Sequence, residues 1–68
     1  MSLVSHLGQH RKVAGLTQAQ LAEAVGVSRK TINTVENQVF IPSTLLALKL
    51  AKALDLKVED LFALEDGL

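Results

Sequence analysis

Apolar residues recur along this chain at intervals of three and four, the spacing typical of amphipathic helices. Short breaks at glycine, proline and hydroxyl residues divide the pattern into five predicted helices. In chain order they cover residues 3–14, 17–26, 28–37, 42–54 and 58–62. Hydrophobic residues make up 49% of the sequence but aromatic residues only 3%, a bias that suits small packed helices better than a sheet. The pattern therefore predicts one compact all-α domain over residues 1–68.

Capping residues mark the boundaries of the second and third predicted helices. Thr17 is suited to cap the second helix, and Gln20 is spaced to complete a capping box with it. Gly26 can adopt the left-handed conformation that ends this helix, and Ser28 is suited to cap the next one. Two short helices joined by one tight glycine turn are the pattern of a helix-turn-helix.

The third predicted helix divides into an apolar and a polar face. Ile32 and Val35 are expected to point into the core. The polar face carries the expected base contacts, Arg29, Lys30, Asn33 and Thr34. Arginine suits the O6 and N7 acceptors of guanine, and asparagine suits N6 and N7 of adenine, so Arg29 and Asn33 are the strongest candidates for reading DNA. The alternative is an ordinary solvated helix face.

An ordered set of residues resembles the small bacterial and phage transcriptional regulators of the Xre type, which include Cro and the lambda-type repressors. The set comprises Arg11, Gly15-Leu16-Thr17-Gln18, Leu21-Ala22, Gly26-Val27-Ser28, Ile32, Glu36-Asn37, Pro42-Ser43, Leu48, Ala51 and Leu54. The resemblance implies a lambda-repressor-like fold of five helices with the helix-turn-helix at the second and third. It also implies binding of double-stranded operator DNA as a homodimer, without a ligand-binding domain.

Contacts to DNA phosphates are expected on both sides of the third helix. The candidates are Thr17, Gln18, Ser28, Asn37 and Gln38. In the resembling repressors, the glutamine at the place of Gln18 bonds both the DNA backbone and the start of the reading helix. The family usually has glycine where Gln38 stands, and basic residues often follow there, whereas this chain continues with Val39 and Phe40. We therefore expect a shallower salt dependence of DNA binding than a strongly basic repressor shows.

The residues that carry the resemblance include a pair of opposite charges, Arg11 and Glu36. We interpret this pair as a structural clamp between the first and third helices, and not as a catalytic one. If the pair is partly buried, removing one partner strands a charge and costs about 3 to 5 kcal/mol.

Other kinds of chemistry find little support in the sequence. The chain has no cysteine, and His6 and His10 lack both the glutamate of a zinc-protease motif and an evident third ligand, so no metal site is expected. No glycine-rich phosphate loop, grouped nucleophile or tuned carboxylate pair occurs, so we expect no enzyme, no cofactor and no small-molecule ligand. No segment predicts a membrane span, which indicates a cytoplasmic protein.

The distribution of charge leaves two functional hypotheses open. The formal net charge is zero, but residues 1–34 carry four cationic side chains against one carboxylate, a balance of +3, and residues 35–68 carry three against six, a balance of −3. The positive half contains the predicted reading helix, which favours a repressor that occupies a palindromic operator. A neutral chain also suits a protein-interaction module of the antitoxin or antirepressor type.

Dimerisation is expected because one domain of this size reaches only one half-site. Residues 56–68 are the candidate dimer contact, with Leu61, Phe62 and Leu64 as the interface residues. Leu61 is also expected to close the core of the domain, and Phe62 is open to either role. The alternative for the whole segment is a hydrophobic lid on the monomer.

Overall fold

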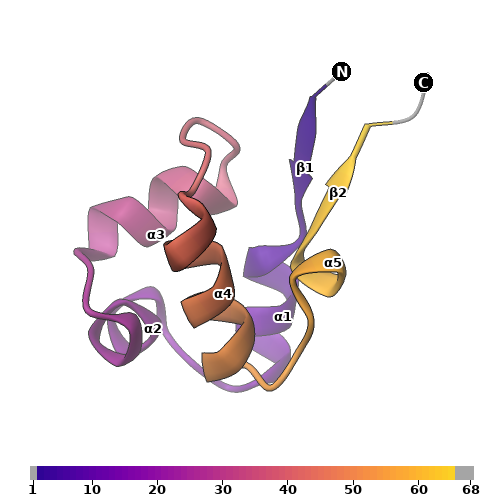
Figure 1. The fold of residues 1–68 in the computed structure, drawn as a ribbon. Coiled ribbons are helices and arrows are strands. Elements are labelled where there is room, and N and C mark those ends of the chain that lie inside the picture. The colour runs from indigo at the N-terminus through magenta and orange to yellow at the C-terminus, as the bar shows by residue number, and fades with distance from the viewer. Residues whose placement is uncertain (1, 66–68) are drawn as a thin grey trace.

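The computed structural model describes residues 2–65, which form five helices and two short strands (Figure 1). The elements are β1 (Leu3–Ser5), α1 (Leu7–Val13), α2 (Gln18–Val25), α3 (Arg29–Glu36), α4 (Thr44–Ala53), α5 (Val58–Leu61) and β2 (Phe62–Leu64). The expectation of a compact five-helix domain is confirmed, and the two strands are an addition to it. None of the helices within residues 2–65 is long and apolar enough to cross a lipid bilayer.

One hydrophobic core joins all five helices. Every helix contributes at least one side chain that is essentially inaccessible to solvent: Leu7, Leu21, Ile32, Val35, Leu50 and Leu61. Helix α2 packs against both α3 and α4, and α4 packs in turn against α5. The apolar face predicted for α3 is confirmed, because Ile32 and Val35 are 0% and 1% exposed. This packing fixes which face of α3 remains in solvent.

The predicted helix boundaries of the helix-turn-helix are confirmed by their hydrogen bonds. Thr17 Oγ1 accepts from the Gln20 amide at 3.0 Å, and Gln20 Oε1 accepts from the Thr17 amide at 2.9 Å, which completes the capping box. Ser28 Oγ accepts from the amide of Thr31 at 3.1 Å. Gly26 has φ 76°, so it occupies the left-handed region that ends α2. The sequence therefore encodes this turn locally.

The first predicted helix is wrong at its start. Residues 3–5 form β1, which pairs antiparallel with β2 in the register Leu3 with Leu64 and Ser5 with Phe62. Leu3 and Val4 lie at helical spacing from Leu7, but pairing with a distant strand gives their backbone groups partners that the local pattern does not reveal. Phe62, expected to end the fifth helix, begins β2. The two strands project together from the helical body and carry both ends of the chain (Figure 1).

Candidate nucleic-acid interface

The exposed face of α3 carries three of the four residues expected to contact bases. Arg29, Lys30 and Asn33 are exposed, whereas Thr34 is half-buried. The Thr34 hydroxyl donates to the backbone carbonyl of Thr31 at 2.9 Å, so its proton is already used within the helix. Two cations in the first turn and an amide one turn later thus share the solvent side of a helix whose other side is locked into the core.

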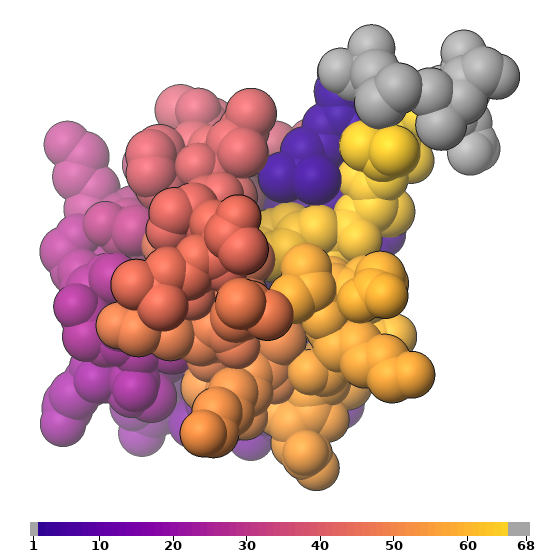
Figure 2. Space-filling view, viewed as in Figure 1, coloured from indigo at the N-terminus to yellow at the C-terminus, as the bar shows by residue number. Residues whose placement is uncertain are grey.

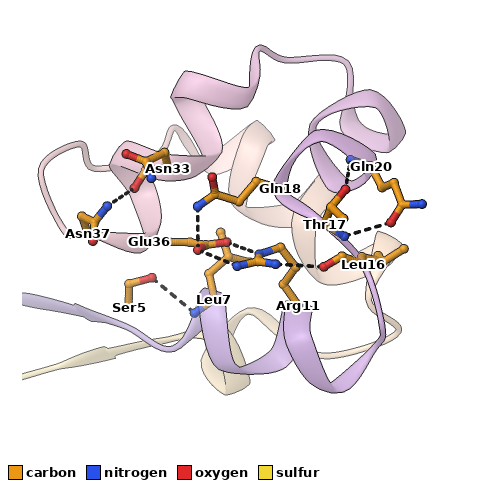
Figure 3. A network of polar contacts seen from close by, with 10 residues as sticks. All are labelled: Ser5, Leu7, Arg11, Leu16, Thr17, Gln18, Gln20, Asn33, Glu36 and Asn37. Carbon is orange, nitrogen blue, oxygen red and sulfur yellow. Dashed lines mark hydrogen bonds and ion pairs between the residues drawn. The ribbon is translucent and has the colours of Figure 1, made fainter.

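The C-terminal end of α3 is held by an ion pair of low exposure (Figure 3). Arg11 Nε lies 2.6 Å from Glu36 Oε2, and Arg11 Nη2 donates to Glu36 Oε1 at 3.2 Å. Each of the two side chains is only 10% exposed. Arg11 Nη1 also donates to the carbonyl of Leu16 at 2.8 Å. The guanidinium therefore ties α1 to α3 and to the turn before α2, as the expected clamp between the first and third helices requires.

The pKa values of the pair reflect this geometry. The hydrogen bond to Glu36 raises the pKa of Arg11. Burial acts to lower this pKa, but the negative charge of Glu36 also raises it, so the pKa lies above its ordinary value. Burial acts to raise the pKa of Glu36, but hydrogen bonds from Arg11 and Gln18 and the charges of Arg11 and Lys12 outweigh it, so the pKa lies below its ordinary value. Both groups are therefore charged near neutral pH.

Gln18 is the third member of this cluster, a role that the sequence does not predict. Its Nε2 donates to Glu36 Oε1 at 3.1 Å (Figure 3), so the first turn of α2 is linked to the last turn of α3. The resemblance implies a bond from Gln18 to the DNA backbone, which stays a prediction, and a second bond to the start of the reading helix. In the structure the Gln18 side chain contacts the end of that helix and not its start. The bond to Glu36 uses only Nε2 of Gln18, and Oε1 takes no part in it.

The other residues expected to contact phosphates lie at helix ends with their side chains partly engaged. Thr17 and Ser28 are exposed and cap α2 and α3. Asn37 Nδ2 donates to the carbonyl of Asn33 at 2.9 Å. Gln38 Oε1 accepts from the amide of Ser5 at 2.9 Å, which ties the loop after α3 to β1. These contacts fix the position of both amides beside α3.

The backbone conformation of Gln38 explains why glycine is usual at this position in the resembling family. Its φ is 61°, in the left-handed region that most side chains avoid. The amides of Val39 and Phe40 both donate to the carbonyl of Thr34, at 2.9 and 3.2 Å, and so hold the loop in this conformation. The hydrogen bond to β1 offsets part of the conformational cost of a glutamine here.

Two of the three residues expected at a dimer interface are buried in the monomer. Leu61 is 0% and Phe62 7% exposed, because both belong to the hydrophobic core. Leu64 is 54% exposed and is the one of the three that offers a free side chain. Residues 66–68 of the proposed contact segment lie outside the described residues. The core therefore takes up Leu61 and Phe62, a role that the sequence analysis also gave them, and the dimer contact stays a prediction.

Comparison with known proteins identifies the class to which this fold and this exposed helix belong. Residues 7–61 match the helix-turn-helix family model, and the chain belongs to that family, within its Xre and lambda-repressor type. The chain is thus a helix-turn-helix transcriptional regulator with the fold of a DNA-binding domain.

Individual relatives agree with this assignment. An uncharacterized HTH-type transcriptional regulator of Methanothermobacter thermautotrophicus is 51% identical over 61 residues, which cover 87% of this chain and 88% of the relative. The uncharacterized HTH-type transcriptional regulator YgzD of Bacillus subtilis is 48% identical over 52 residues, 76% of this chain and 79% of that protein. The restriction-modification controller protein C.AhdI of Aeromonas hydrophila superimposes with a TM-score of 0.75 at 35% identity, over 79% of this chain and 82% of that one.

Proposed function

We propose that this chain is a homodimeric repressor that reads a palindromic operator by inserting α3 of each copy into the DNA major groove. The observation that carries the proposal is the division of α3 into two faces. Ile32 and Val35 are locked in the core, while Arg29, Lys30 and Asn33 stand in solvent on a helix braced at its far end by Glu36. Occupancy of the operator would block transcription without any further domain.

The side chains on the exposed face suit base recognition. Arg29 can pair with O6 and N7 of guanine, and Asn33 with N6 and N7 of adenine, each good bidentate pair giving about 1 to 3 kcal/mol of discrimination. Lys30 adds a second donor beside Arg29, and Thr34 supplies a hydroxyl oxygen or methyl group. The two cations stand at the positive end of the helix dipole, a position that costs about 0.3 to 1 kcal/mol in the free protein. An anionic DNA strand relieves this cost.

Groups flanking α3 suit the DNA phosphates. The N-termini of α2 and α3 present free amides together with Thr17, Gln18 and Ser28. At the other end, the loop hydrogen bonds leave the Gln38 side-chain nitrogen available as a donor beside Asn37. These neutral donors would fix the register of α3 without a large counterion effect.

The size of the domain suits two copies on one DNA face. Its Cα atoms extend over 35 × 21 × 20 Å. Successive major grooves on one side of DNA are about 34 Å apart, so two such domains side by side can each place one α3 in a groove.

A fluorescence anisotropy titration against selected operator DNA tests the base contacts. Arg29→Ala and Asn33→Ala are expected to reduce discrimination between the operator and scrambled DNA by about tenfold to a hundredfold each. Lys52→Ala is the matched control, because it removes one exposed positive charge from the last turn of α4 instead of α3. Unchanged sequence preference in both α3 variants would refute the proposal.

A second function is favoured by a different observation. Val39 and Ile41 in the loop after α3 are 77% and 71% exposed, and Leu45 on α4 is 63% exposed, which is much apolar surface for a small domain of zero net charge. This surface suits a protein-interaction module that uses the same fold. Such a module would capture a protein partner tightly and enrich no sequence from random DNA.

A further inference from the structure

A groove lies between α3 and the loop that follows it, beside the proposed base contacts. Its volume is about 330 Å³, and we call it the α3 groove. It is lined by Ser28, Lys30, Thr31, Thr34, Val39 and Phe40. Figure 2 shows the loop after α3, in salmon, at the surface of the molecule between α3, in pink, and β1, in indigo. The loop therefore adds its own side chains to the surface that Lys30 occupies on α3.

Val39 and Phe40 give the α3 groove an apolar wall that remains in contact with solvent. Val39 is 77% exposed and Phe40 is 47% exposed. Their backbone amides both donate to the carbonyl of Thr34, so the wall is fixed to the last turn of α3. This part of the loop thus offers DNA an apolar contact and not a charged one.

The hydroxyl groups around the α3 groove are already engaged in hydrogen bonds within α3 and its cap. The hydroxyls of Ser28 and Thr31 lie 2.9 Å apart and share a hydrogen bond, and the Thr34 hydroxyl donates to the carbonyl of Thr31. Lys30 is the one charged side chain among the six lining residues, all of which lie within residues 2–65, and it is exposed. One cationic donor beside an apolar wall is therefore what remains for recognition.

We propose that the α3 groove reads thymine in the operator, with Lys30 donating to O4 and Val39 and Phe40 contacting the C5-methyl group. This inference rests on the proposed function and adds the loop after α3 to the elements that read DNA. In the major groove, thymine is the base that presents an acceptor, O4, next to a methyl group. The α3 groove presents the matching pair, an ammonium group next to apolar side chains.

The other bases satisfy only part of this surface. Cytosine presents an amino group in the major groove, which places a donor against the donor of Lys30. Guanine offers acceptors to Lys30 but has no methyl group, and adenine also lacks one. Each of these bases leaves the apolar wall formed by Val39 and Phe40 in contact with water.

Charge selects DNA as the occupant of the α3 groove. Lys30 lines the groove, and Arg29 precedes it in the first turn of α3, where the helix dipole is also positive. None of the six lining residues, all in the part of the chain that the structure describes, is acidic. A polyanion is therefore attracted to this end of α3, whereas an apolar protein partner would bury Lys30 without an opposite charge.

Anisotropy titrations with the selected operator, in which each thymidine is replaced in turn by deoxyuridine, test this contact. Deoxyuridine lacks the methyl group but keeps O4. For the wild-type chain, replacing one particular thymidine in each half-site is expected to weaken binding by about fourfold per methyl group. In Val39→Ser and in Phe40→Ser the effect should fall below about twofold, because the apolar contact is lost while the backbone bonds to Thr34 remain.

Ile41→Ser is the matched control for these variants. It removes an apolar side chain of the same loop that is 71% exposed but does not line the α3 groove, so the full methyl effect should persist. Thermal melts followed by circular dichroism check that every variant is folded. Because Val39 is largely exposed, Val39→Ser keeps the test decisive even if Phe40→Ser is unstable.

Three results would overturn the inference: an operator without a shared thymine in its half-sites, a full methyl effect in both α3-groove variants, or loss of that effect in Ile41→Ser. The test also separates this contact from the proposed function. A chain that enriches a palindrome but binds every deoxyuridine-substituted operator like the parent DNA retains the function and loses the thymine contact. A chain that enriches no DNA sequence loses both, and capture of a protein partner that Val39→Ser and Ile41→Ser weaken alike then supports the interaction module.

Discussion

Replacing Arg11 by Met is the sharpest test of how α3 is held in place. Methionine keeps the length and the apolar stem of the side chain but removes the guanidinium. The change deletes two hydrogen bonds to Glu36, at 2.6 and 3.2 Å, and one to the carbonyl of Leu16 at 2.8 Å. The Glu36 carboxylate then keeps only the hydrogen bond from Gln18, in a side chain that is only 10% exposed in the wild type.

The expected loss of stability follows from the burial of the pair. Removing one partner of a buried ion pair costs about 3 to 5 kcal/mol, because the remaining charge is left without compensation. A domain of this length is stable by about 3 to 10 kcal/mol in total, so the change removes a large share of the stability. Glu36→Met should cost a similar amount, since it strands the Arg11 charge. The double variant should lose less than the two single losses together, with a coupling of at least about 2 kcal/mol.

Urea unfolding followed by circular dichroism measures these differences as shifts in the midpoint at constant slope. A loss of 3 kcal/mol corresponds to a fall in Tm of at least about 12 °C for a domain of this size. Glu23→Met and Lys52→Met are matched controls, because they remove exposed charges from α2 and α4 and should change stability by less than about 0.5 kcal/mol. Single losses below about 1 kcal/mol, or losses that simply add in the double variant, would refute the clamp.

Three further predictions concern stability. Gly8→Ala in α1 should give no net gain in the free energy of unfolding despite alanine's helix propensity, because the new Cβ would lie 3.1 Å from Glu36 Oε1. Gly26→Ala should cost about 1 kcal/mol through its φ of 76° alone, since a Cβ there meets no atom within 4 Å. Thermal melts of both variants check this contrast. Ser28→Ala should cost about 1 kcal/mol in urea unfolding by removing the cap on the Thr31 amide, and an unchanged midpoint would count against that cap. Because the folded pKa of Glu36 lies below its ordinary value of 4.5, the stability from its charge is present above that pH and is lost as the pH falls through the folded pKa. Unfolding measured below about pH 4.5 should therefore show a smaller pH dependence for Glu36→Gln than for the wild type, and equal slopes would contradict this assignment.

The features that the sequence predicted well are those encoded by local spacing. Thr17, Gln20, Gly26 and Ser28 determine the turn through bonds and dihedral angles that span only a few residues, and the structure confirms them. The alternation of faces on α3 follows from helical geometry in the same way.

The features that the sequence could not predict depend on contacts between distant segments. β1 exists because residues 62–64 pair with it, and no local pattern in Leu3 to Ser5 distinguishes that strand from the first turn of a helix. The hydrogen bond from the Ser5 amide to Gln38 has the same origin, because it joins β1 to the loop after α3. Leu61 and Phe62 have the composition of an interface, but the end of α5 and the start of β2 place both in the core.

Selection from random double-stranded DNA with the wild-type chain, Arg29→Ala and Asn33→Ala tests the central claim most directly. We predict that the wild type enriches a palindrome whose half-sites are centred about one helical turn apart. Each variant should enrich the same spacing but lose preference at one base position in each half-site. Failure of the wild type to enrich any sequence, or recovery of an identical motif by both variants, would contradict the assignment of α3 as the element that reads DNA.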